Sequence, residues 1–298
     1  MKKAIGYVYV IAAAVCWGFL GLFNRVLTAA GVSLLNMMPL RFGGTAILFT
    51  AFCMAFKRQV FRIRLRHLPI FLGSGLISML LLGLVYFRCQ QLCSLAVASI
   101  LMYLAPSFVV LFGAIFWKTP LTARKITALL LALCGCALVS GIVGSDVRIS
   151  LEGLLMGLAS GLCYGGYTIF AHYGMRYYDS FTMAYWTFLI AGVASLFLAD
   201  WPTLLPALAE PRTGLAALGL MVVGTALPFT LYTKGLETVE GGKAAIIANI
   251  EPVMSAVIGV TVFQETLSLW TLTGIVLVLS GVVVLACEKE RASSAGVG

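Results

Sequence analysis

Charged residues are scarce in this chain of 298 residues, since only 10% are Asp, Glu, Lys or Arg. A soluble domain usually has about 25% charged and about 45–50% apolar residues. Here 61% are apolar, and the mean hydropathy is +1.03. This leaves too little polar surface to cover a water-soluble globule, and a disordered chain needs low hydrophobicity and many charges. The composition therefore predicts an integral membrane protein.

Catalytic and metal-binding motifs are also missing. The eight cysteines form no C-x-x-C pair, and none lies at metal-ligand spacing from one of the two histidines. The sequence contains no G-x-x-x-x-G-K-S/T stretch, so we do not expect ATP to drive its activity directly. We predict no catalytic residue, no metal and no cofactor, and we interpret the cysteines as small packing residues.

Ten apolar stretches are long enough to cross a membrane, which takes ~20 residues at ~1.5 Å per residue. They cover residues 5–23, 34–56, 68–87, 94–116, 125–143, 151–173, 180–199, 213–233, 243–263 and 269–286. The connections between them are short. Lys2 and Lys3 resemble the start of a signal peptide, but the stretch that follows them recurs in the second half. We therefore expect it to be retained as a span.

Basic residues collect in alternate connections. Fifteen of the twenty Lys and Arg residues fall on one side of the ten-span chain, four fall on the other, and Arg41 lies within the second span. Basic loops stay cytoplasmic, so we predict a protein of the plasma membrane with both termini in the cytoplasm. The net charge of +9 is then a topology signal, and we predict no nucleic-acid partner.

One loop, KRQVFRIRLRH at residues 57–67, carries five of these basic residues. Two interpretations stay open for it. The loop either only sets the topology, or it also meets anionic lipid at the inner leaflet.

The two halves of the chain are related by a repeat. Pro106 in YLAPSFVVLFGAIFW matches Pro252 in NIEPVMSAVIGVTVF at an offset of 146 residues. With one residue more, Cys-Trp-Gly at 16–18 matches Cys-Tyr-Gly at 163–165. Each repeat holds five spans, and because five is odd, the second copy enters the membrane upside down. The basic bias of the loops reverses in the same way.

The predicted fold class is therefore an all-α polytopic membrane protein with ten transmembrane helices. It consists of two inverted five-helix repeats, at residues 1–146 and 147–298. Inverted repeats are typical of secondary transporters, which bind their substrate near the membrane midplane between the halves. Two mirrored halves can exchange inward-open and outward-open shapes around one such site.

The segment 247–281, IANIEPVMSAVIGVTVFQETLSLWTLTGIVLVLSG, resembles the ten-helix EamA-like branch of the drug/metabolite transporter superfamily. The resemblance rests on Glu251-Pro252, on Glu265 at the end of the same span and on Gly281 in the last span, and it covers nearly the whole chain. It implies export of small metabolites, amino acids or drugs. The first repeat has no carboxylate at the position equivalent to Glu251, so any acidic mechanism rests on the second repeat.

Glu251 and Arg41 are deep charges of opposite sign. Glu251 lies ~12 Å past the cytoplasmic start of the ninth span, and Arg41 lies ~10 Å from the outer end of the second. Pro252 predicts a helix kink, as Pro106 does in the fourth span, and the freed carbonyls, Asn249 and the carboxylate suit a cationic group or a proton. We hypothesise that Glu251 and Arg41 line one central cavity. The alternatives are a structural glutamate bonded to a neighbouring helix and an arginine that snorkels to the interface.

Aromatic side chains within or near the ends of spans form a second set of candidates. They are Trp17, Tyr86, Tyr103, Tyr164, Tyr167 and Tyr232. Such rings offer an apolar surface with a polar tip, which suits aromatic or cationic solutes. We predict that they form the wall of the substrate cavity. The alternative is lipid-facing or interfacial anchoring.

Two other classes of function remain as alternatives. A polytopic membrane enzyme acting on lipid needs clustered His, Asp or Glu at the interface, and a non-transporting scaffold needs large partner-binding loops. The sequence shows neither feature. The expected partners are a small-molecule substrate and membrane lipid, and coupling to protons through Glu251 is a further hypothesis. The sequence predicts no particular oligomeric state.

Overall fold

The computed structural model describes residues 2–143, 150–266 and 268–286, and within these ranges the chain is helical and contains no strand. The helices of the first half are α1 (Lys2–Gly18), α2 (Leu20–Ala29), α3 (Leu34–Met38), α4 (Thr45–Phe56), α5 (Leu68–Leu72), α6 (Leu82–Leu92), α7 (Leu95–Met102), α8 (Ala105–Phe116) and α9 (Ala123–Val139). Those of the second half are α10 (Leu151–Gly174), α11 (Ser180–Ser195), α12 (Trp201–Ala209), α13 (Pro211–Met221), α14 (Leu227–Leu236), α15 (Gly241–Ala248), α16 (Ile250–Phe263) and α17 (Leu269–Ala286). The predicted boundary between the halves, at residues 146 and 147, lies outside the described residues and stays a prediction.

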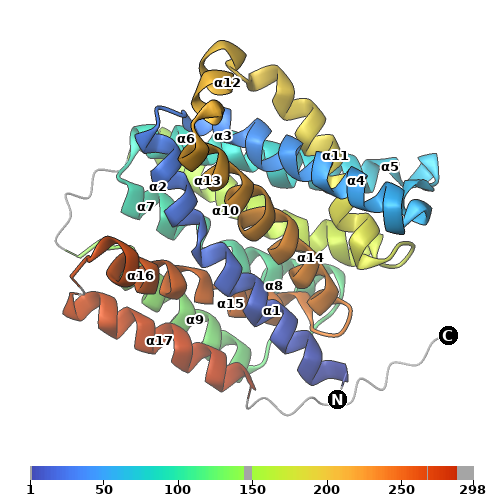
Figure 1. Cartoon of the computed structure of the whole chain (residues 1–298). Coiled ribbons are helices and arrows are strands. Elements are labelled where there is room, and N and C mark those ends of the chain that lie inside the picture. The colour runs from blue at the N-terminus through green and yellow to red at the C-terminus, as the bar shows by residue number, and fades with distance from the viewer. Residues whose placement is uncertain (1, 144–149, 267, 287–298) are drawn as a thin grey trace.

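Nine helical segments of the described chain are long and apolar enough to cross a membrane. They correspond to nine of the ten predicted stretches. The remaining stretch, predicted over 125–143, is α9, which has 17 residues and is therefore about 26 Å long at 1.5 Å per residue. It lies side by side with α17 at one edge of the bundle (Figure 1), as a slightly short tenth span would. The all-α, multi-span fold predicted from the sequence is confirmed.

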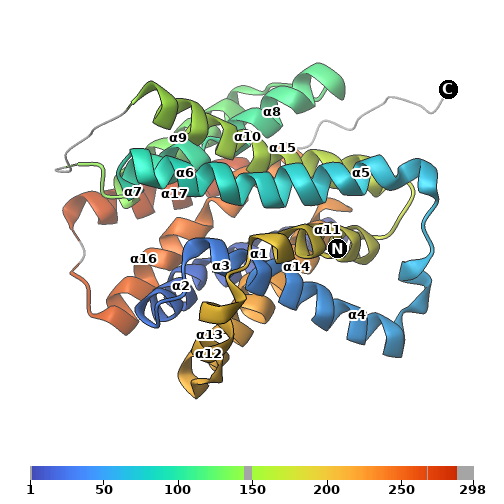
Figure 2. The same cartoon turned by 90° about the horizontal axis from the view of Figure 1, so that it is seen from above.

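Each contact between two spans has a counterpart between the equivalent spans of the other half. The first span (α1) packs against the eighth (α14), and the sixth (α10) packs against the third (α6), which runs alongside it (Figure 2). Likewise α1 contacts the ninth span (α15, α16), and α10 contacts the fourth (α7, α8). The second span packs on the seventh, and the fifth packs on the tenth. Each contact thus maps onto an equivalent contact, as expected for two related repeats.

Two repeat-related prolines lie next to breaks in the fourth and ninth spans. Helix α7 ends at Met102 and α15 ends at Ala248, each four residues before Pro106 or Pro252. A proline nitrogen cannot donate to the carbonyl four residues earlier, and its ring clashes with that carbonyl. The helix therefore ends there and restarts as α8 or α16. In the ninth span this break places Asn249 between two helical segments.

Wider helical turns, with hydrogen bonds from residue i to i+5, occur in three spans. These π-helical segments are η1 (Pro39–Gly44), η4 (Gly73–Leu81) and η6 (Val222–Ala226). Shifted by the repeat offset of 146 residues, η4 overlaps η6. Such segments are frequent at functional sites, and here η1 carries Arg41 while η6 carries Thr225.

Charge is divided unequally between the halves. The first 145 residues contain thirteen of the twenty basic residues and no Asp or Glu. A cation of this segment can therefore form an ion pair only with a carboxylate from the rest of the chain. Among the described residues, four ion pairs with N–O distances of 2.5–3.1 Å join the halves in this sense. They are Arg25–Glu265, Lys57–Asp179, Arg88–Glu152 and Lys125–Glu240.

Candidate functional site

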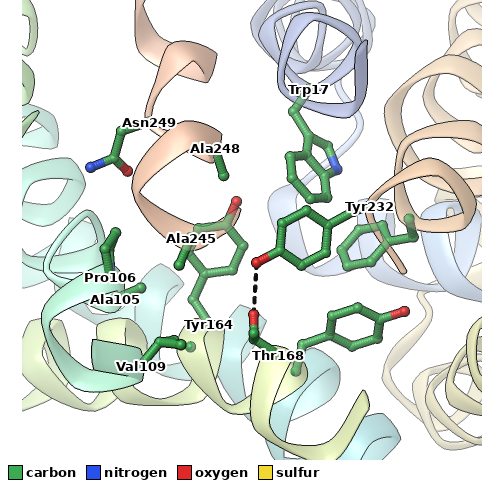
Figure 3. Close-up of a pocket in the computed structure, with 13 residues that line it drawn as sticks. Trp17, Ala105, Pro106, Val109, Tyr164, Thr168, Tyr232, Ala245, Ala248 and Asn249 are labelled. Atoms are coloured by element: carbon green, nitrogen blue, oxygen red, sulfur yellow. Dashed lines mark hydrogen bonds between the residues drawn. The ribbon is translucent and has the colours of Figure 1, made fainter. Parts of the chain in front are cut away.

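A small cavity lies between helices of both halves (Figure 3). Its walls come from α1 and α8 of the first half and from α10, α14 and α15 of the second. Its volume is about 20 Å³, and one water needs roughly 10–15 Å³. Pockets that bind small molecules usually measure about 300–1,000 Å³. The cavity is therefore closed in this conformation, and a solute enters only after the surrounding helices move apart.

Aromatic rings form much of the cavity wall. The Trp17 ring centroid lies 5.0 Å from that of Phe229, 5.4 Å from that of Tyr232 and 6.4 Å from that of Tyr164. Tyr167 packs edge-on against Phe229 with a centroid distance of 5.0 Å. Each such pair stabilises the packing by about 0.5–1.5 kcal/mol beyond the burial of area. The structure thus brings four of the six predicted aromatic residues together at the cavity.

Two hydroxyl pairs join α10 to α14. Tyr167 Oη lies 2.5 Å from Thr233 Oγ1. Tyr232 Oη lies 2.8 Å from Thr168 Oγ1, and Figure 3 marks this bond with a dashed line. Burying an unpaired hydroxyl is costly, and these bonds remove that cost. Tyr167 and Tyr232 therefore present their rings to the cavity while their hydroxyls hold the two helices together.

Glu251 lies next to this wall, in the first turn of α16, and its side chain is buried. Its Oε2 atom accepts a hydrogen bond of 3.0 Å from the hydroxyl of Tyr164, whose ring lines the cavity. A negative side chain is also favoured in the first turn of a helix, where the backbone dipole is positive. Tyr164 thus connects the cavity to a carboxylate that the helix break and the hydrogen bond keep in place.

Arg41 is held from the opposite repeat. Its Nε atom donates to Thr225 Oγ1 at 3.2 Å, and the Thr225 hydroxyl donates in turn to the carbonyl of Leu220 at 2.9 Å. Within the described residues no ion pair joins Arg41 to Glu251, and their hydrogen-bond partners are Thr225 and Tyr164. Neither side chain lines the closed cavity. The hypothesis that both line one central cavity is therefore not met by the closed cavity and stays a prediction.

Tyr86 and Tyr103 also lie away from the closed cavity. The Tyr86 hydroxyl is 3.1 Å from Ser99 Oγ, which joins the third span to the fourth. Tyr103 lies at the break between α7 and α8 and packs against a buried cluster formed by α9, α16 and α17. Neither tyrosine is therefore part of the present cavity wall.

Two hydrogen-bond donors at the cavity are buried without a partner among the described residues. They are Trp17 Nε1 and Asn249 Nδ2, and both residues line the cavity. An unpaired buried donor costs about 1–3 kcal/mol, so a solute that supplies acceptor oxygens would recover this energy. No group of three His, Cys, Asp or Glu side chains gathers as a metal site in the described part of the chain.

Three residues around the site were not predicted from the sequence. Thr168 follows Tyr164 by four residues, which places both on one helix face, so the spacing contained this signal. Phe229 is buried at the centre of the aromatic group, 4.9 Å from Phe188, and Thr225 holds Arg41. The positions of the first repeat that are equivalent to Phe229 and Thr225 are Gly83 and Met79. A comparison of the two repeats therefore could not reveal these two residues.

A bundle of membrane-spanning helices with a central cavity between two related halves is the architecture of a membrane transporter. The model of the EamA-like transporter family matches the chain twice, at residues 4–141 and 151–287. The chain therefore belongs to the EamA-like transporter family, as the sequence resemblance predicts. The two matches agree with the two repeats.

Similar proteins share nearly the full length of the chain. The uncharacterized inner membrane transporter YicL of Salmonella typhimurium is 26% identical over 303 residues, which is 97% of this chain and 98% of YicL. The uncharacterized transporter YwfM of Bacillus subtilis is 25% identical over 300 residues, 99% of this chain and 98% of YwfM. A solved crystal structure of a protein with 18% identity matches 94% of this chain and 95% of its own with a TM-score of 0.77, which shows a common fold.

Proposed function

We propose that this transporter is a secondary exporter of small amphipathic metabolites, such as amino acids or amphipathic drugs, across the plasma membrane. The observation that carries the proposal is the aromatic-walled cavity between the halves, next to a buried carboxylate. A solute with an apolar body and a charged amine fits these neighbours best. The proposal includes inverted repeats and cytoplasmic termini, which the basic loops support.

The proposed binding residues fall into two groups. Trp17, Tyr164, Tyr167, Tyr232 and Asn249 line the closed cavity, and Glu251 bonds to one of them, Tyr164. Arg41, Tyr86 and Tyr103 do not line the closed cavity. In an opened cavity the rings would take up the apolar body of the solute. The amine would face Glu251, and the unpaired donors of Trp17 and Asn249 would face acceptor oxygens of the solute.

Alternating access requires that contacts between the halves separate at one end while they hold at the other. Of the four ion pairs that join the halves, two lie at the predicted outer face and two at the predicted cytoplasmic face. The outer pairs are Arg25–Glu265 and Arg88–Glu152, and the inner pairs are Lys57–Asp179 and Lys125–Glu240. Exposed pairs stabilise by only about 0–1 kcal/mol. The three exposed pairs, Arg25–Glu265, Arg88–Glu152 and Lys57–Asp179, are therefore weak enough to separate in each transport cycle, whereas Lys125 of the fourth pair is buried and its pair is expected to hold more strongly.

Asp179, a carboxylate at the predicted cytoplasmic face, is in surroundings that favour its charged form. Burial alone raises the pKa of Asp179, but hydrogen bonds from Thr182 and Lys57, together with the charge of Lys57, hold that pKa below its ordinary value. Asp179 also caps α11, where its Oδ1 atom accepts from the Thr182 backbone nitrogen at 2.8 Å. The Lys57–Asp179 ion pair is therefore expected to persist throughout the neutral pH range.

The proposal is tested by transport into inverted membrane vesicles, with candidate solutes taken from a resistance screen of cells that over-express the protein. Glu251→Gln removes the charge beside the cavity and is expected to abolish most uptake of cationic amphiphiles. Glu237→Gln is the matched control, since Glu237 lies at the surface and pairs with Lys234 three residues away. Full transport by well-inserted Glu251→Gln and Arg41→Ala variants would contradict the proposed site.

Coupling to protons through Glu251 is a separate part of the proposal. An imposed pH gradient across inverted vesicles is expected to change the transport rate of the unaltered protein, and the residual rate of Glu251→Gln is expected not to respond to the gradient. A rate in the unaltered protein that is indifferent to the gradient would discard the coupling and leave the transport activity standing.

A further inference from the structure

A second, larger hollow lies at one end of the bundle, away from the central cavity. This groove has a volume of about 470 Å³, which is within the usual range of about 300–1,000 Å³ for ligand sites. One wall is formed by Arg64, Arg66, His67 and Ile70, at the end of the basic loop and the start of α5, and the other by the end of α10. The groove therefore opens at the seam between the two halves.

The loop wall is held in place by tyrosines of the second half. Tyr178 Oη accepts a hydrogen bond of 2.9 Å from the backbone nitrogen of Arg64 and lies 3.0 Å from Nδ1 of His67. The His67 ring stacks on Tyr177 with a centroid distance of 4.1 Å. These contacts fix the backbone of residues 64–67 against the second half, so the two arginines project from an ordered segment.

Arg64 and Arg66, the cations that line this groove, have no ion-pair partner in the part of the chain that the structure describes. The first 145 residues contain no carboxylate. Asp179, which follows shortly after the opposite wall in the sequence, is paired with Lys57. Another cation, Arg176, does not line the groove, but its guanidinium carbon lies 5.0 Å from the ring centroid of Tyr173, which does. An anionic ligand would complete this arrangement, and guanidinium groups bind phosphate in a two-pronged geometry.

The groove lies at the level of a membrane interface. Its walls belong to the first turns of the span Leu65–Leu92 and to the last turns of the span Leu151–Gly174. Ile70 and Phe170 form its apolar part, and Tyr173 is an aromatic of the kind enriched at membrane interfaces. A soluble anion would use only the arginines, whereas a lipid would also use the apolar part.

We propose that this groove binds an anionic phospholipid of the cytoplasmic leaflet, with its phosphate at Arg64 and Arg66 and an acyl chain along Ile70 and Phe170. The basic loop that sets the topology thereby also forms a lipid site. Because one wall belongs to each half, a bound lipid holds the halves together at the inner face. Anionic lipid is therefore expected to favour the conformation that is closed to the cytoplasm.

The test uses the full-length protein in phosphatidylcholine nanodiscs with increasing phosphatidylglycerol, and it measures binding of a fluorescent phosphatidylglycerol. Arg64→Gln/Arg66→Gln is expected to weaken binding roughly tenfold or more, since each arginine contributes separately. Arg58→Gln/Arg62→Gln is the matched control, because it removes the same charge from the same loop outside the groove. Equal losses in both variants, or no loss in the first, would overturn the proposal.

A measurement on the unaltered protein avoids any effect of substitutions on insertion. A phosphatidylglycerol with a photo-reactive group near its glycerol is expected to label residues 64–70 and 170–177, as located by mass spectrometry. Labelling spread evenly over the membrane surface would contradict the site. Competition by soluble glycerol phosphate at the same concentration as the lipid would assign the groove to a free phosphate compound and would also overturn the lipid proposal.

Discussion

The ion pair between Lys125 and Glu240 permits a quantitative test of how the two halves are held together. Lys125 Nζ lies 2.7 Å from Glu240 Oε1 and donates a second hydrogen bond of 3.0 Å to the carbonyl of Pro120. The Lys125 side chain is 2% exposed and that of Glu240 is 31% exposed. The ammonium group is therefore buried, and the carboxylate supplies its counter-charge.

Replacing the carboxylate should cost more than an ordinary surface substitution. Removing one partner of a fully buried pair costs about 3–5 kcal/mol. Because Glu240 is partly exposed, water can partly solvate the ammonium group once the carboxylate is gone. We therefore expect Glu240→Gln to lower the free energy of unfolding by about 2 kcal/mol. Lys125→Met removes the buried charge itself and should cost about 1 kcal/mol or less. The double variant should then be less damaging than the sum of the two by at least about 1 kcal/mol.

The measurement is unfolding of the purified full-length protein by sodium dodecyl sulfate titration in mixed micelles. Glu237→Gln provides the matched control. Glu237 is 33% exposed, close to Glu240, but its partner Lys234 is 49% exposed, so its loss should cost less than about 0.5 kcal/mol. Equal effects of Glu240→Gln and Glu237→Gln, or additive effects in the double variant, would refute the reasoning that burial of the lysine sets the magnitude.

Three further outcomes are expected in the same assay. Asp179→Ala should lower the unfolding free energy by about 1 kcal/mol at neutral pH; because the folded-state pKa is depressed, this difference should shrink below about pH 4 as the carboxylate protonates, and a pH-independent difference would contradict it. Gly18→Ala should lower the free energy of unfolding by about 1–3 kcal/mol, because the added Cβ would lie 3.2 Å from the backbone of Met254. Gly21→Ala should be near neutral, because its added Cβ would lie 3.6 Å from the nearest atom. Equal effects of the two variants would refute this packing argument. Phe229→Ala, at a position 2% exposed, should cost about 3–5 kcal/mol, and a loss below about 1 kcal/mol would show that the aromatic group repacks.

Much of the fold could be predicted because few backbone structures are able to span a membrane. Backbone groups in hydrocarbon must bond internally, so long apolar runs become helices. The breaks next to Pro106 and Pro252 likewise follow from the missing proline donor. The π-helical segments were not predicted, because apolar periodicity does not distinguish a bond to residue i+4 from one to i+5.

The candidate site was only partly predictable. Trp17 and Tyr164 are repeat mates, and the repeat placed both at equivalent depths, where the structure brings them to one cavity. Arg41 finds its partner Thr225 across 184 residues, and this pairing depends on how two spans are rotated against each other. A rotation of one residue, about 100° on a helix, would separate the two side chains. The sequence carries no signal for that rotation.

The sequence by itself determined that the cations of residues 1–145 can pair only with carboxylates further along the chain, because this segment holds thirteen cations and no Asp or Glu. Which carboxylate each cation finds was decided only by the tertiary structure, since an ion pair needs atoms within a few ångströms. Packing placed Lys125 against Glu240 and left Arg64 and Arg66 without a carboxylate partner among the described residues. Because carboxylates are scarce, Arg64 and Arg66 are available for the anionic lipid that we propose.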